Sequence, residues 1–462
     1  MAKKIKLSSY RDRRLKTNDR NHVPLPTGPY QKIGCRDFMV GLSRKSGVLV
    51  RLYYPAKTET SSKKFEKSSQ LNPLLWPNWL PHEFYLQGLA DVASVRTNFF
   101  LSLINKTKRE NVFIPVIPNA RPHVLKNDKY PVIIFSHGLG GFRTSNSAIC
   151  IELASNGFVV AALEHRDNTA CLSFYPKRAT YSLKSSNPDF FNISPDQIDA
   201  DDEVDFGDEI DDPNYVPPKA LAALTNIPYL ELAWIRYRNV SISRMDEKVL
   251  AFRKKQINQR TRECTRALDL IEALNAGYEI NNLLDPGYDS REFENQLDMD
   301  RLVMMGHSMG ASTALMAGAT ELRFKIIIAL SPWMFPLRNE AIDLIPQPIL
   351  MVLSENLTKD DDYLETVQEW IGENRDDEFR KIVLIKGSNR LQQSDFPYVF
   401  KGFRYLKLLT WRNRIDSFDV HDLTNYLSMR FISKQLDTQI DERIDKFLEE
   451  KRKRLRFLSI KH

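Results

Sequence analysis

The sequence lacks any uninterrupted apolar run of about 18 residues, the length that a transmembrane helix needs. Its N-terminus, Met1-Ala-Lys-Lys-Ile-Lys6, also lacks the apolar stretch of a secretory signal. Position 2 is alanine rather than glycine, which excludes N-myristoylation. We therefore expect a cytoplasmic protein without a membrane-spanning helix.

Cysteine is scarce, with four residues in a chain of 462, and no two of them stand in CxxC spacing. These are Cys35, Cys150, Cys171 and Cys264. A disulfide scaffold and a cysteine-rich zinc site are both excluded by this count. We expect reduced and mostly buried thiols in a reducing compartment, and neither a metal nor a cofactor.

Charge is unevenly distributed around a formal net value of +7. Residues 196–212 hold ten acidic side chains and no basic one, whereas residues 1–25 carry eight Lys or Arg. A second basic run, Lys451-Arg-Lys-Arg-Leu-Arg456, lies near the C-terminus. Such basic and acidic tails can contact a protein partner or an anionic lipid. No nucleic-acid-binding motif accompanies them, so we expect no nucleic-acid partner.

Apolar residues make up 42% of the chain, enough for a sizeable core. An apolar strand at 130–135, a helix at 145–155 and an apolar strand at 158–163 follow one another. Continuous apolar strands joined by helices indicate a mostly parallel sheet with helices on both faces, an α/β fold. Further strands of this sheet are predicted at 48–54, 302–305, 324–330, 348–353 and 381–385.

The chain is predicted to contain one large domain with irregular additions. Residues 1–25 form a basic disordered arm, and residues 26–437 form the α/β domain. A lid-like insertion at about 170–235 contains an acidic disordered segment at about 186–215. A long charged helix is predicted at 241–276, and residues 438–462 are predicted as a charged C-terminal helix.

Gly306-His307-Ser308-Met309-Gly310 is a G-x-S-x-G element with a strand before it and a helix after it. In that context the serine sits on a sharp strand-to-helix turn, and its hydroxyl points out above the sheet. Glycine at both ends removes Cβ atoms that would collide with the neighbouring strand and helix. We predict Ser308 as a nucleophile.

His137-Gly-Leu-Gly-Gly141 follows an earlier strand of the same sheet. Glycines there allow backbone N–H groups to face a reacting carbonyl and form half of an oxyanion hole. The predicted donors are the N–H groups of Leu139 and Met309, the second of which also begins a helix. An ordinary glycine turn is the alternative interpretation.

Several ordered motifs together resemble the platelet-activating-factor acetylhydrolase family (plasma/type II, phospholipase A2 group VII). They are Gly28-Pro-Tyr30, Leu52-Tyr-Tyr-Pro55, Tyr130-Pro-Val-Ile-Ile-Phe-Ser-His-Gly-Leu-Gly140, Phe142-Arg-Thr144, Glu164-His-Arg-Asp167, Gly306-His-Ser-Met-Gly310 and Trp333-Met-Phe-Pro-Leu337. The resemblance runs from about residue 28 to about residue 436. It implies an α/β-hydrolase fold and serine-dependent, calcium-independent hydrolysis of short or oxidised sn-2 acyl esters of phospholipids. The expected ligand is then a phospholipid or another acyl ester.

Two positions depart from the family pattern. The family acid immediately precedes the Trp-Met-Phe-Pro-Leu segment, where this chain has Ser331. The family histidine belongs to a Gly-Ser-x-His stretch, where this chain reads Gly387-Ser-Asn-Arg390. A guanidinium stays protonated and cannot act as a general base. Arg390 in this position favours an anion instead.

These departures leave two main hypotheses for function, beside a different chemistry at Ser308. The first is a catalytically impaired member or pseudoenzyme that keeps the lipid or acyl pocket, or serves as a scaffold. The second is an active phospholipid acyl-ester hydrolase, a 1-alkyl-2-acetylglycerophosphocholine esterase, that uses an unrecognised base. His421 is a weak candidate for that base because it falls in the predicted final helix. Glu355 is available as an acid, but it has no base to orient.

Peripheral membrane contact is a separate hypothesis. The aromatic stretch Leu74-Leu-Trp-Pro-Asn-Trp-Leu80 and the segment Phe84-Tyr-Leu86 carry several large apolar groups near an insertion. Burial of Trp76 and Trp79 in the core is the alternative interpretation.

Overall fold

The structure is a computed structural model and describes eleven stretches of the chain. They are residues 21–57, 75–94, 111–178, 230–240, 245–338, 340, 345–358, 361–371, 379–400, 415–438 and 441–458. The chain divides into one unit of Met1–Tyr175 with Trp234–His462, and a second unit of Pro176–Ala233. The predicted acidic segment 186–215 and residues 1–20 lie outside the described residues.

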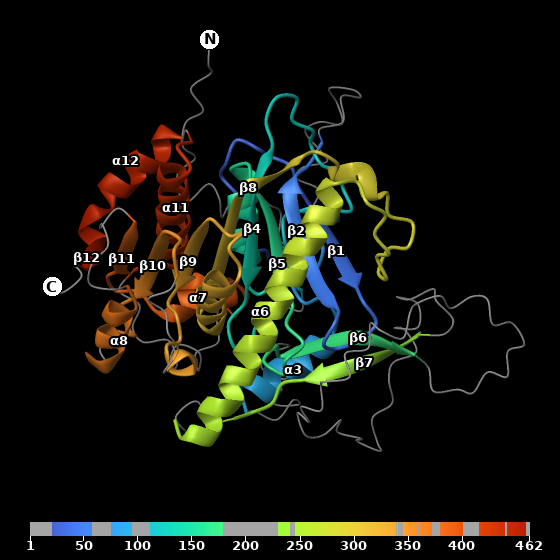
Figure 1. Ribbon diagram of the computed structural model, residues 1–462. Helices are drawn as coiled ribbons and strands as arrows, with labels where there is room; N and C mark the ends of the chain where they lie inside the picture. The colour runs from blue at the N-terminus through green and yellow to red at the C-terminus, as the bar shows by residue number, and fades with distance from the viewer. Residues whose placement is uncertain are drawn as a thin grey trace, which may run out of the picture. The chain divides into compact units, whose positions relative to one another are not determined.

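A ten-stranded sheet organises the first unit, in the order β12-β11-β10-β9-β8-β4-β5-β2-β1-β3 (Figure 1). The strands from β11 to β5 pair in parallel, whereas β2 joins β5, β1 joins β2, and β12 joins β11 in antiparallel fashion. Their bounds are β1 (Ile33–Val40), β2 (Val48–Pro55), β3 (Ile117–Pro118), β4 (Tyr130–Ser136), β5 (Val159–Leu163), β8 (Leu297–His307), β9 (Ile326–Leu330), β10 (Ile349–Ser354), β11 (Arg380–Ile385) and β12 (Leu455–Leu458). The predicted mostly parallel sheet is confirmed.

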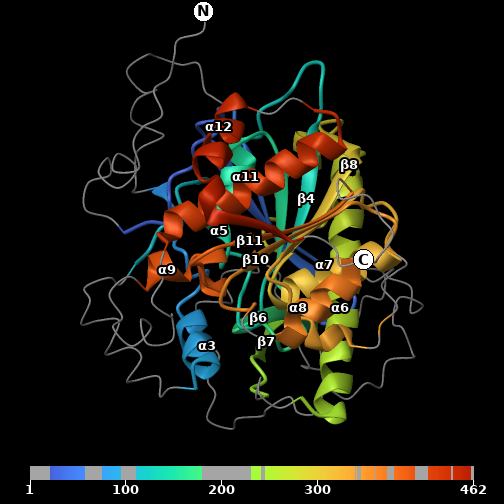
Figure 2. The same cartoon turned by 90° about the vertical axis from the view of Figure 1, so that its left-hand side faces the viewer.

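Helices cover both faces of this sheet, as Figure 2 shows. Because strand side chains alternate, Ile133 and Phe135 of β4 pack into one core, and Val132 and Ile134 pack into the other. The first core includes α5 (Ser147–Ser155), α11 (Ser417–Gln435) and α12 (Glu442–Glu450), and the second includes α6 (Glu247–Asn275) and α7 (Met309–Thr320). The predicted helices at 145–155 and 241–276 correspond to α5 and α6.

The remaining described elements are short or lie at the ends of strands. They are α3 (Phe84–Val92), α8 (Asp361–Ile371), α9 (Phe396–Val399), η5 (Ser290–Phe293), η6 (Phe335–Leu337), η7 (Arg390–Gln393) and η8 (Arg452–Arg454). β6 (Leu172–Arg178) and β7 (Leu230–Arg236) pair in a separate two-stranded sheet. Within the described stretches, no helix has the length and apolar character to cross a membrane.

Two predicted boundaries are wrong. Residues 21–25 belong to the folded domain, because Val23 is fully buried and its N–H donates to the Phe113 carbonyl at 3.0 Å. Among the described residues of the predicted C-terminal helix over 438–462, the α-helix runs only from Glu442 to Glu450. It is followed by strand β12, in which Leu455 is buried and Phe457 is 59% exposed. This alternation of buried and exposed side chains is typical of a strand at the edge of a sheet. The backbone of β11 supplies the hydrogen bonds that residues in a helix would make with one another.

The aromatic stretch before α3 packs inward. Trp76 and Trp79 are 5% and 1% exposed. The Trp79 ring lies against Phe142, and its indole N–H donates to the Asp395 carboxylate at 3.0 Å. The core interpretation of these two tryptophans is therefore confirmed. All four cysteines are free and buried.

Candidate functional site

The turn between β8 and α7 holds Ser308 in a strained conformation, with φ 56° and ψ −118°. A Cβ at Gly306 would lie 2.0 Å from the Gly310 carbonyl oxygen, and one at Gly310 would lie 2.0 Å from the Ser136 carbonyl oxygen. Both glycines are therefore required by close backbone approach. The structure has the strand-to-helix turn that the G-x-S-x-G spacing predicts.

The two predicted oxyanion donors belong to two neighbouring parts of the fold. Met309 is the first residue of α7, and Leu139 lies on the loop after β4. No hydrogen bond among the described residues uses the N–H of either residue. Arg260 of α6, ion-paired with buried Asp167 at 3.1 Å, donates to the His137 carbonyl at 2.7 Å and so holds the start of the loop. The geometry suits the predicted oxyanion donors, whose role stays a prediction.

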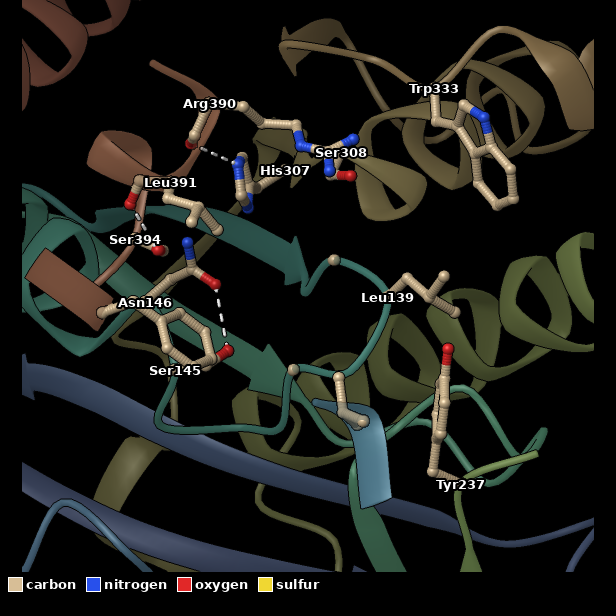
Figure 3. Close-up of a pocket in the computed structure, with 14 residues that line it drawn as sticks. Leu139, Ser145, Asn146, Tyr237, His307, Ser308, Trp333, Arg390, Leu391 and Ser394 are labelled. Atoms are coloured by element: carbon tan, nitrogen blue, oxygen red, sulfur yellow. Dashed lines mark hydrogen bonds between the residues drawn. The ribbon is translucent and has the colours of Figure 1, made fainter. Parts of the chain in front are cut away.

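A cavity of about 110 Å³ lies above the turn (Figure 3). Ser308 lines it together with Leu139 from the β4 loop, Arg390 from η7, Trp333 from the segment after β9, and Tyr237 from the segment after β7. Figure 3 shows the Arg390 side chain extending toward Ser308. The structure thus brings together Ser308, Leu139 and Arg390, three of the residues singled out from the sequence.

His307 lines the cavity beside Ser308, but its ring is engaged elsewhere. Its Nε2 lies 3.1 Å from the Arg390 carbonyl oxygen, so this nitrogen carries the proton and donates. Burial, and then the nearby Arg390 charge, lowers the pKa of His307 to about 3. His307 is consequently neutral at ordinary pH.

The other candidate histidines are remote from the serine hydroxyl or already bonded. His137 uses one ring nitrogen on the Gly138 carbonyl and the other on the backbone N–H of His165. His165 contacts Ser136 Oγ at 2.7 Å and Glu263 at 2.5 Å. His421 is buried within α11, against Tyr398, and does not line the cavity. Among the described residues, no histidine ring nitrogen is hydrogen-bonded to the Ser308 hydroxyl.

Ser331, where the resemblance predicts the acid, is fully buried and does not line the cavity. Its hydroxyl donates to Gln393 Oε1 at 2.6 Å and accepts from the Ser354 N–H at 3.1 Å. The Gln393 amide in turn donates to the Val352 carbonyl at 3.1 Å. A neutral and fully bonded side-chain pair therefore occupies this position.

Glu355, the second candidate acid, bonds to backbone. Its Oε2 accepts from the Gly387 N–H at 3.1 Å and shapes the loop that carries Arg390. The neighbouring Asn356 side chain accepts from the Arg390 N–H at 2.9 Å. Both contacts fix the loop after β11.

The Arg390 guanidinium makes no ion pair with any carboxylate of the described residues. Burial lowers the pKa of Arg390, and nearby Tyr363 partly opposes that effect. The Tyr363 hydroxyl itself donates to the Pro332 carbonyl at 2.9 Å. A guanidinium keeps its proton in such surroundings, so Arg390 is a half-buried cation at the wall of the cavity.

Sequence reasoning missed three residues of the site. Gln393 is recognisable only from its contact with Ser331. Tyr237 and Trp333 reach the cavity from segments far apart in the chain, and buried Arg253 lies beside both. The Arg253 guanidinium carbon is 5.4 Å from the Trp333 ring centre. Their sequence surroundings carry no spacing that would have marked them as cavity residues.

The serine on a strand-to-helix turn above a mostly parallel sheet defines an α/β-hydrolase fold. The fold is shared with the ferulic acid esterase from Streptomyces cinnamoneus, with a TM-score of 0.53, 14% identity, and coverage of 95% of this chain and 99% of that one.

The family profile of platelet-activating factor acetylhydrolase, isoform II, matches residues 15–454. Platelet-activating factor acetylhydrolases from Cavia porcellus and Gallus gallus are each 30% identical to this chain; the matches cover 92% and 91% of it, and 80% and 85% of those proteins. A putative phospholipase A2 from Schizosaccharomyces pombe is 24% identical, with 83% of each chain covered. The chain belongs to the platelet-activating factor acetylhydrolase isoform II family.

Proposed function

We propose that this chain keeps the ester-binding pocket of its family but lacks a general base for Ser308. It would then be catalytically impaired toward short or oxidised sn-2 acyl esters of phospholipids. The observation that carries the proposal is Arg390, which extends toward Ser308 from the loop where the family has a histidine. An arginine cannot accept the serine proton, so the hydroxyl stays an unactivated alcohol.

The neutral contact between Ser331 and Gln393 supports the same proposal. A triad needs a carboxylate to orient the imidazole and to stabilise its charged form. Ser331 provides no charge, and its hydroxyl is already engaged. Loss of both the base and the acid leaves only the oxyanion donors and binding as sources of rate acceleration.

An active esterase is the second candidate, favoured by the intact turn. Ser308 retains its strained backbone, and the N–H groups of Leu139 and Met309 have no partner among the described residues. Such an enzyme would need a base other than the described histidines, and it would act as a 1-alkyl-2-acetylglycerophosphocholine esterase. Cytoplasmic location, peripheral membrane contact and protein contacts through the charged tails stay predictions.

Labelling with a serine-reactive fluorophosphonate tests the proposal. The reagent reports the nucleophilicity of the hydroxyl and needs no knowledge of the natural substrate. We expect the wild type to label no faster than Ser308→Ala. Rapid labelling that disappears in Ser308→Ala would favour the active esterase.

A further inference from the structure

Arg390 is the only charged side chain among the described residues that line the cavity above Ser308. Enclosing a cation without a counter-charge is costly, and the cost falls when an anion enters beside it. Two of the other polar side chains of the wall are hydrogen-bonded within the protein. The Asn146 amide donates to the Gln393 carbonyl at 2.8 Å, and Ser394 Oγ donates to the Leu391 carbonyl at 2.6 Å.

Three groups at the cavity can donate hydrogen bonds to a ligand. They are the guanidinium of Arg390, the hydroxyl of Ser308 and the backbone N–H group of Leu139. None of these groups has a hydrogen-bond partner among the described residues. A set of donors around a cation matches a carboxylate, which offers two acceptor oxygens and one negative charge.

Much of the rest of the wall is apolar. Val92, Leu139, Trp333, Leu391 and Phe396 line the cavity, whose volume is about 110 Å³. This surface suits a short aliphatic chain, since apolar area leaves water on binding. A phosphate group offers no apolar part to cover it.

We infer that the cavity is a binding site for the anion of a short-chain monocarboxylic acid. The carboxylate lies between the Arg390 guanidinium and the N–H group of Leu139, beside the Ser308 hydroxyl, and the aliphatic chain lies on the apolar wall. This inference rests on the proposed function, in which Arg390 takes the place of the base and presents a positive charge to the cavity. The site would then serve as a carboxylate receptor on a hydrolase fold.

Isothermal titration of the full-length chain with sodium butanoate tests the inference. We expect saturable one-site binding by the wild type, weakened at least about tenfold by Arg390→Gln and less by Arg390→Lys, which keeps the charge. Arg452→Gln is the matched control, because its side chain is 72% exposed and the substitution changes net charge equally. That variant should bind as the wild type does. Butanamide, which has the same shape but no charge, should bind the wild type at least about tenfold more weakly.

Each alternative outcome counts against the inference. Equal binding of butanoate and butanamide by the wild type would overturn it without relying on any variant. Unchanged affinity for butanoate in Arg390→Gln would overturn it as well, provided that circular dichroism shows the variant to be folded. If equimolar inorganic phosphate displaces butanoate, the inferred ligand class is wrong, and the site binds phosphate rather than a carboxylate. Butanoate is not an ester, so wild-type esterase activity would contradict the proposed function and leave this binding test standing.

Discussion

At the residue scale, His307 and Arg390 are coupled through one hydrogen bond and one repulsion. The His307 ring donates to the Arg390 carbonyl, while burial and the Arg390 charge hold the pKa of His307 at about 3. An unfolded histidine has a pKa of about 6.5. Below pH 6.5 the His307 ring takes up a proton in the unfolded chain but not in the folded chain. The free energy of unfolding therefore decreases as the pH falls from 6.5 toward 3.

Replacement of this histidine tests the coupling. Between pH 7.5 and pH 5.5, the wild type should lose about 1.4 kcal/mol more of its free energy of unfolding than His307→Gln. Glutamine can keep a donor toward the Arg390 carbonyl but does not titrate. Urea unfolding at both pH values measures the difference. An identical pH dependence in the two proteins would contradict the buried, neutral state of His307.

At the element scale, the β8–α7 turn depends on two backbone approaches that exclude any Cβ. Gly310→Ala should destabilise the chain by about 3 kcal/mol or more, because the new methyl group would lie 2.0 Å from the Ser136 carbonyl oxygen. Gly287→Ala is the matched control, since a Cβ there meets nothing within 4 Å. Thermal unfolding measures the stability of both variants relative to the wild type. Equal stability of the two variants would show that the turn can relax.

The sequence predicts those elements whose own residues show a regular period of buried side chains. The apolar strands of the parallel sheet, helices α5 and α6, and the turn at Ser308 are predictable because their side chains are buried with a regular period. Strand β12 was missed, because four residues after a basic run do not reveal that the edge of β11 needs a partner. The Ser331–Gln393 contact was missed for a similar reason, since 62 residues separate the two side chains.

At the scale of the whole molecule, the fold brings three distant segments to one cavity. The β4 loop supplies Leu139, the β8–α7 turn supplies Ser308, and the loop after β11 supplies Arg390. The family profile matches residues 15–454, so the proposed loss of activity concerns particular positions within a scaffold that the chain shares with its family. Restoring those positions should restore activity.

The double variant Arg390→His with Ser331→Asp supplies both missing groups. A positioned base contributes about 10²–10⁴-fold to rate, and triad members act as a unit, so neither single variant should match the pair. The Ser354 N–H, which donates to Ser331 Oγ at 3.1 Å, is available to the new carboxylate.

Hydrolysis of a short-chain sn-2 phospholipid, compared between the wild type and Ser308→Ala, tests the central claim most directly. The double variant is assayed alongside them. We predict near-background turnover by both the wild type and Ser308→Ala, and a rise of about 100-fold in the double variant. Robust wild-type turnover that disappears in Ser308→Ala would contradict the claim that Ser308 lacks a base.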